Sequence, residues 1–185
     1  MAISTSITPD YSKGAPVSTA TPVFTITIKV QSLNQATETP SSNHVLVYVV
    51  IGDGELTTIP NSKNLKIACN GITGTDKISV NLKNSTRVLD CDLFGRTPNG
   101  STIQIYYTGL IHENDKLKAF ESGESNVADF NDYNHFNYPQ FKLGDGIEDE
   151  YKWLAENSFI GQGRFIKDEE GSAYVQYVVS ILENP

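Results

Sequence analysis

The sequence is poor in the residues that build the commonest metal and disulfide sites. Its 185 residues include two cysteines and three histidines. Cys69 and Cys91 are too few for a disulfide framework, and we expect both to be reduced, buried thiols. No histidine pair, cysteine pair or HExxH motif has metal-ligand spacing, so we predict no metal ion.

Complete cofactor and hydrolase signatures are also missing. Gly161-Gln162-Gly163 lacks the third glycine and the following helix of a dinucleotide-binding loop. A G-x-S-x-G nucleophile elbow does not occur. We therefore expect no cofactor.

Positive charge is scarce. There are 14 lysines and arginines against 22 aspartates and glutamates, a formal net charge of -8. An acidic surface repels phosphate, so we expect no nucleic-acid partner. No apolar run is long enough to span a bilayer, so no membrane partner is expected either. Residues 1–22 lack the basic start and apolar stretch of a secretory signal, which favours a cytoplasmic protein.

The dominant signal is an alternation of period two. Phe24, Ile26, Ile28 and Val30 alternate with polar residues, as in a half-buried strand. The clearest hairpin joins two strands through an Asn-Gly turn; these strands are Arg87 to Phe94 and Thr102 to Gly109. Helix is scarce, with candidates only at Asn114 to Glu121 and Glu148 to Asn157. The aromatic and polar stretch from Asn126 to Gly146 is typical of a long irregular functional loop.

Several strands carry apolar or aromatic groups on both faces, which favours a barrel over a sandwich. The predicted fold is all-β: a single antiparallel β-barrel, calycin-like or similar, of about eight or more strands, with one or two short helices. We expect residues 1–21 to form a flexible N-terminal arm and residues 22–185 to form the barrel domain.

From Pro22 to Leu182 the chain resembles a family of small microbial β-barrel proteins catalogued as a domain of unknown function, number 3237. Pro22 to Ile26 resembles its opening strand, and Gly74-Thr75-Asp76 lies where the family has a Gly-Ala-Asp-like turn. The strongest similarity lies between Tyr133 and Gly163, in the order and spacing of Tyr133, Pro139, Phe141, Gly144, Tyr151, Trp153, Leu154, Phe159, Gly161 and Gly163. The resemblance implies the barrel fold and carries no settled activity.

The candidate catalytic residues are Asp76 and His135. Asp76 has the sequence context of a turn residue, and its match to the family makes it a site candidate. His135 lies within Tyr133 to Tyr138, where aromatic and amide side chains suit a flat organic ligand. We expect this segment to close over one mouth of the barrel. The candidate ligand-binding residues are Tyr106, Tyr107, Tyr133, Phe136 and Tyr138.

Strand alternation places some of these candidates on opposite faces. Tyr106 and Tyr107 are neighbours in one strand, so only one can reach the interior. Asp90 and Asp92 share a face that we expect to point outward, because the residues between and beside them are apolar.

Three functions remain open. The first is a barrel that binds a small, largely apolar organic ligand and catalyses a cofactor-free isomerisation or cyclisation. The second is a non-enzymatic carrier or sensor that uses the same pocket. The third is a structural or interaction protein with a filled barrel and a homodimer interface.

Overall fold

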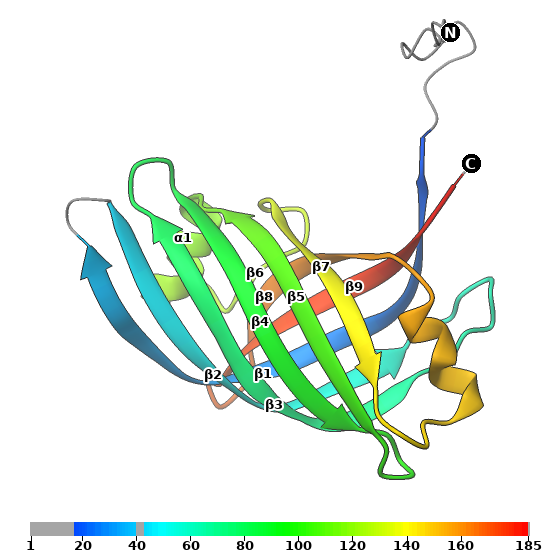
Figure 1. The fold of residues 1–185 in the computed structure, drawn as a ribbon. Coiled ribbons are helices and arrows are strands. Elements are labelled where there is room, and N and C mark those ends of the chain that lie inside the picture. The colour runs from blue at the N-terminus through cyan, green and yellow to red at the C-terminus, as the bar shows by residue number, and fades with distance from the viewer. Residues whose placement is uncertain (1–16, 40–42, 185) are drawn as a thin grey trace, which may run out of the picture.

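The computed structural model describes residues 17–39 and 43–184, which form a closed antiparallel barrel (Figure 1). Neighbouring strands pair in the order β1-β2-β3-β4-β5-β7-β8-β9, and β9 returns to β1. A short ninth strand pairs with β8 outside the closed circle. The strands are β1 (Thr19–Thr39), β2 (His44–Thr58), β3 (Ala68–Asn81), β4 (Thr86–Arg96), β5 (Thr102–His112), β6 (Val127–Ala128), β7 (His135–Leu143), β8 (Phe159–Lys167) and β9 (Ala173–Glu183).

The predicted all-β barrel, with about eight or more strands and one or two short helices, is confirmed, and there are two short helices in the described residues. The helices are α1 (Asp115–Ser122) and a 3₁₀ helix, η1 (Asp149–Ala155). The expected hairpin is β4 and β5, which pair from Thr86–His112 to Arg96–Thr102. Most of the arm expected over residues 1–21 lies outside the described residues; β1 begins at Thr19, paired with Glu183.

The prediction of a long irregular loop between Asn126 and Gly146 was wrong. This segment contains β6 and the full-length barrel strand β7. β7 pairs with β5 along its length, but with β8 only at Phe136 and Asn137. Pro139 therefore has no paired residue in β8. Proline has no backbone N–H, and on this unpaired side its absence breaks no hydrogen bond between strands.

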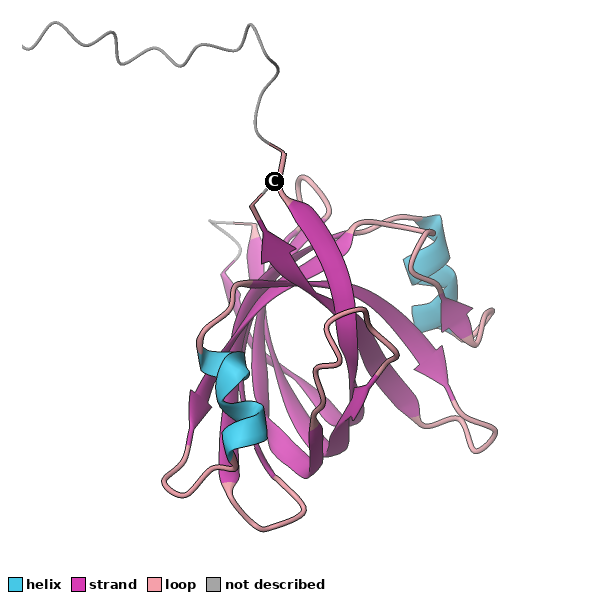
Figure 2. Ribbon diagram, turned by 90° about the vertical axis from the view of Figure 1, so that its right-hand side faces the viewer, coloured by secondary structure: helices cyan, strands magenta, loops and turns pink. Residues whose placement is uncertain are grey.

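One half of the barrel is filled by side chains. Phe24, Phe141, Phe159 and Trp153 form an aromatic cluster with ring centroids 5.3–6.1 Å apart. Trp153, in η1, is half-buried, and its indole N–H donates to the carbonyl of Lys66 at 3.2 Å. Figures 1 and 2 show η1 at this end of the barrel and α1 at the opposite end.

Both cysteines are free and buried, as predicted. Cys69 and Cys91 belong to the core of the barrel, with 0% exposure each. Across residues 17–39 and 43–184, no helix has both the length and the hydropathy needed to cross a bilayer.

Helix α1 packs against the other end of the barrel. Asn114 caps its first turn by accepting hydrogen bonds from the N–H groups of Lys116 and Leu117. Its last turn has no basic residue of its own, and Lys167 of β8 donates to the Phe120 carbonyl at 2.9 Å. A cation near a helix C-terminus is favourable, so this contact also suits the helix dipole.

Candidate functional site

A cavity of about 440 Å³ occupies the half of the lumen nearer α1. All eight barrel strands and α1 contribute to its wall, and most of the lining is aliphatic or aromatic. Leu117 and Phe120 are the buried residues of α1, and both form part of this wall. A mostly apolar cavity with a few polar groups is the usual form of a small-molecule site.

Asp76 is a buried carboxyl in the wall of this cavity. It lies inside β3, paired with Cys91 of β4 and Val49 of β2, so the expectation of a turn residue was wrong. Its side chain faces the lumen with 6% exposure and accepts a hydrogen bond from the Asp90 N–H at 3.2 Å. Burial raises the pKa of Asp76 to about 7, and the Asp90 charge adds to this, while the hydrogen bond opposes it. Near neutral pH the carboxyl can therefore either take or give a proton.

His135 is the centre of a buried chain of hydrogen bonds. Its Nδ1 lies 3.2 Å from the Tyr133 hydroxyl, and its Nε2 lies 2.9 Å from the Tyr177 hydroxyl. Burial, helped by the nearby Arg87 charge, lowers the pKa of His135 to about 3. The ring is therefore neutral, with one nitrogen donating and the other accepting.

The Gly161-Gln162-Gly163 segment makes room for this chain. Both glycines face the lumen from β8. A Cβ on Gly163 would lie 2.6 Å from Nδ1 of His135, and a Cβ on Gly161 would collide with the amide of Asn137. Gly161 and Gly163, which do not form a dinucleotide-binding loop, thus leave room for the side chains of His135 and Asn137.

Tyr107 and Tyr177 complete the polar part of the cavity. Both are 1% exposed, and their rings pack edge to face with centroids 5.5 Å apart. Burial raises the pKa of each hydroxyl well above its usual value, and the negative charge of Asp76 adds to both shifts. Asp76, Tyr107 and Tyr177 all line this one cavity.

Of the seven site residues predicted from sequence, three line this cavity: Asp76, Tyr107 and His135. Tyr133 does not line the cavity, but its hydroxyl contacts Nδ1 of His135, which does. Tyr177 was missed, although its position in the alternating Val175, Tyr177, Val179 stripe marks it as an inward-facing tyrosine.

The other three predicted residues lie on the outer face of the barrel. Tyr106 is 37% exposed, Tyr138 is 51% exposed, and Phe136 is partly exposed. They alternate with the inward residues of β5 and β7, so they do not line the lumen cavity. The segment from Tyr133 to Tyr138 does not cap a mouth, because β7 begins at His135.

The outward orientation of the Asp90 and Asp92 pair is confirmed. Asp90 is exposed, and Asp92 is partly exposed. Asp92 accepts a hydrogen bond from the side chain of Gln104 at 2.8 Å. Asp90 acts on the site through its N–H, which donates to Asp76, and through its charge, which helps to raise the pKa of Asp76.

Arg87 and Glu121, which both line the cavity, are paired with each other. Arg87 binds Glu121 through two hydrogen bonds of 2.6 and 2.9 Å, and Glu113 through a third of 2.6 Å. These bonds tie β4 to α1 and to the segment before it. Asp76 is therefore the carboxyl of the cavity wall that has no recorded ion pair within the described residues.

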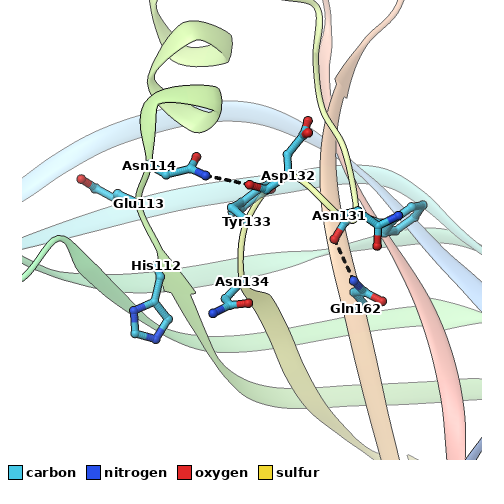
Figure 3. A pocket seen from close by; sticks show the side chains of 9 residues that line it. His112, Glu113, Asn114, Asn131, Asp132, Tyr133, Asn134 and Gln162 are labelled. Atoms are coloured by element: carbon cyan, nitrogen blue, oxygen red, sulfur yellow. Dashed lines mark hydrogen bonds between the residues drawn. The ribbon is translucent and has the colours of Figure 1, made fainter.

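A second, polar pocket of about 450 Å³ lies outside the lumen (Figure 3). Asn114 donates to the Asp132 carbonyl and Gln162 to the Phe130 carbonyl, each at 2.7 Å. These bonds hold the loop that precedes β7 against its neighbours. Within residues 17–39 and 43–184, no three His, Cys, Asp or Glu side chains gather as a metal site.

Comparison with solved structures supports the barrel. A conserved protein of unknown function from Rhodopseudomonas palustris is 19% identical, with a TM-score of 0.68 over 91% of this chain and 99% of that chain. A β-barrel-like protein from Acinetobacter baumannii is 18% identical, with a TM-score of 0.63 over 93% and 100%. A protein described as an enzyme from Penicillium herquei is 12% identical, with a TM-score of 0.56 over 92% and 98%.

The comparison with curated proteins gave no match. The sequence profile of a family described as protein of unknown function (DUF3237) matches residues 18–182, almost the whole chain. The segment covers every barrel strand and the residues around the lumen cavity. The chain therefore belongs to the DUF3237 family.

Proposed function

We propose that the lumen binds a small, largely apolar organic molecule, and that Asp76 moves a proton on it without a cofactor, in an isomerisation or cyclisation. The observation that carries this proposal is a buried carboxyl, with a pKa near 7, in the wall of an otherwise apolar cavity. Burying such a group without a cation is unfavourable for stability. Strained or costly groups of this kind are concentrated at functional sites.

The remaining polar groups suit one end of a ligand. The hydroxyls of Tyr107 and Tyr177 lie in the same wall as Asp76. The other polar groups of the lining are His135, the paired ions Arg87 and Glu121, and Lys167, which donates to the Phe120 carbonyl. The site thus combines one acid–base group with hydroxyl donors in a mostly apolar cavity, which suits proton transfer. Likeness to the fungal protein at 12% identity bears on the fold alone.

A carrier or sensor would use the same cavity without turnover. The barrel is not filled throughout, since about 440 Å³ is open beside α1. This volume favours the two ligand-binding functions over a barrel packed solid with side chains. Binding and turnover must therefore be measured separately.

The binding proposal is tested with the neutral dye N-phenyl-1-naphthylamine, whose fluorescence rises in apolar surroundings. Val175→Trp puts an indole into the cavity, whereas Val178→Trp, three residues along β9, puts one on the partly exposed outer face. We expect saturable binding by the wild type and by Val178→Trp, and binding weakened at least about tenfold, or about 1.4 kcal/mol, in Val175→Trp. Circular dichroism establishes that both variants are folded. Equal binding by folded Val175→Trp would place the dye elsewhere and contradict the lumen site.

A further inference from the structure

We infer that Tyr177 presents its hydroxyl proton to the lumen, and that the cavity takes an enolisable ketone whose oxygen Tyr177 binds while Asp76 moves a proton on the neighbouring carbon. This inference rests on the proposed function and adds to it a ligand class and a role for Tyr177. It makes His135 and Tyr133 positioning residues, because they act through the Tyr177 hydroxyl.

The direction of the Tyr177 hydroxyl follows from the two hydrogen bonds of His135. With the proton on Nε2, the imidazole donates to the Tyr177 oxygen and accepts from the Tyr133 hydroxyl at Nδ1. Every polar hydrogen among Tyr133, His135 and Tyr177 then has an acceptor within this group, except the hydroxyl proton of Tyr177, whose side chain lies in the cavity wall beside Tyr107. With the proton on Nδ1, the Tyr133 hydroxyl proton would have no acceptor among the described residues, in a side chain only 8% exposed.

Each tautomer leaves one hydroxyl proton without a partner among these three residues, and an unmatched buried proton is unfavourable. The Nε2–H tautomer is preferred because its unmatched proton is on Tyr177, at the cavity wall beside the Tyr107 hydroxyl, where an acceptor can reach it, whereas Tyr133 lies outside that wall. Gly163 reinforces this arrangement, since the ring of His135 fills the space where a Cβ would stand. The Tyr177 oxygen accepts a hydrogen bond from the imidazole, which strengthens the bond that its own proton can donate.

Asp76 and Tyr177 together match the needs of keto–enol chemistry. Both line the same cavity, and the Asp76 charge is the largest charge effect on Tyr177. A carboxylate can remove a proton from the carbon next to a carbonyl, and a hydroxyl donor can stabilise the charge that develops on the carbonyl oxygen. An apolar wall accommodates the carbon skeleton.

The proposed step balances without an added reagent. The Asp76 carboxylate forms an O–H bond as the α C–H bond breaks; the electron pair of that C–H bond forms the C=C bond, and the π pair of the C=O bond moves to the carbonyl oxygen. The resulting enolate is held by the Tyr177 hydroxyl. The proton on Asp76 can exchange with solvent, and Asp76 then returns a proton to the α-carbon or, in a conjugated ketone, to a more distant carbon, which moves the double bond and restores the carboxylate.

The probe for this chemistry is 2-tetralone, a compact ketone with acidic α-hydrogens. Exchange of these hydrogens for deuterium in D₂O is followed by proton NMR, with buffer alone as the baseline. We expect the wild type to accelerate exchange, and Asp76→Asn to lower the enzymatic rate by about 100-fold or more. The control is Asp145→Asn, which removes an exposed carboxylate outside the cavity.

Tyr177→Phe removes the donor and retains the ring. We expect exchange at saturating ketone to fall by about 100-fold, while displacement of N-phenyl-1-naphthylamine by 2-tetralone changes by less than about threefold. Tyr106→Phe, on the outer face of β5, is the matched control and should exchange as the wild type does. Tyr133→Phe should reduce exchange and, in ¹⁵N spectra of the His135 ring, increase the Nδ1–H tautomer.

Several outcomes would overturn the inference. If 2-tetralone displaces the dye but exchange stays at the buffer rate, the ketone assignment is wrong and lumen binding stands. If 2-tetralone does not displace a dye that binds in the lumen, the ligand class is wrong. If Tyr177→Phe exchanges like Tyr106→Phe, or the wild-type His135 ring is already in the Nδ1–H form, Tyr177 is not the donor. Failure of the dye itself to bind would instead count against the proposed function.

Discussion

Replacing Asp76 by asparagine should make the protein more stable at alkaline pH. In the folded state the carboxyl has a pKa of about 7, against an ordinary value of 3.8. The folded protein therefore holds this proton more tightly than the unfolded chain does. Stability falls as the pH rises from the unfolded pKa through the folded pKa, because the buried group must ionise. Asparagine cannot ionise, and its side-chain oxygen can still accept from the Asp90 N–H.

The size of the effect follows from the two pKa values. At about 1.36 kcal/mol per pKa unit, the full cost of the charged carboxyl is about 4 kcal/mol above pH 8. Between pH 5 and pH 8 the wild type should lose about 3 kcal/mol relative to Asp76→Asn. For a chain of this size, this corresponds to a difference in Tm of about 6–12 °C.

The assay is urea unfolding of both proteins at pH 5, 6, 7 and 8, with Asp145→Asn as the control for a general change in charge. The difference in unfolding free energy between Asp76→Asn and wild type should grow steadily with pH, whereas the control difference should stay flat. A difference that is independent of pH would mean that Asp76 is already ionised in the folded state at pH 5. The acid–base role assigned to it would then be refuted.

Further predictions concern neighbouring residues. His135 has a folded pKa of about 3, below its ordinary value of 6.5, so the stability that depends on its neutral ring is fully present above pH 6.5. On acidification to pH 4 the free energy of unfolding should fall by about 3 kcal/mol through this group. Ring ¹⁵N shifts that show a charged imidazole at pH 5 would contradict this. Gly163→Ala should destabilise by about 1–3 kcal/mol in urea unfolding, because its Cβ displaces the His135 ring, and a neutral effect would mean that the ring is loosely held. Trp153→Ala should lower the unfolding free energy by about 3 kcal/mol, because Trp153 packs on Phe24 and Phe159, and an unchanged Tm would show that η1 is not anchored by it.

The barrel could be predicted because strand alternation is a local signal. β4 and β5 were recognisable from their alternating residues and the Asn-Gly turn. β7 was missed because it has no β-branched residue and contains Pro139. Its strand conformation comes from pairing with β5, which a local pattern does not reveal.

Only part of the site could be predicted, because the faces of the strands and the contacts between distant strands are not local signals. The composition around His135 pointed to a functional segment, but composition cannot assign a face, so Phe136 and Tyr138 were grouped with an inward residue. Asp76 resembled a turn residue because of its neighbours, and only the pairing of β3 with β2 and β4 places it inside the barrel. Tyr177 lies 42 positions from His135, and their hydrogen bond depends on barrel closure.

The central claim is that the lumen is a ligand site in which Asp76 and Tyr177 act on the same molecule. A crystal structure of the protein soaked with 2-tetralone tests it most directly. We expect the ketone inside the cavity beneath α1, with its oxygen about 2.7 Å from the Tyr177 hydroxyl and an α-carbon facing Asp76. A lumen closed by side chains, or a ketone bound only on the outer face beside Tyr106 and Tyr138, would contradict the account.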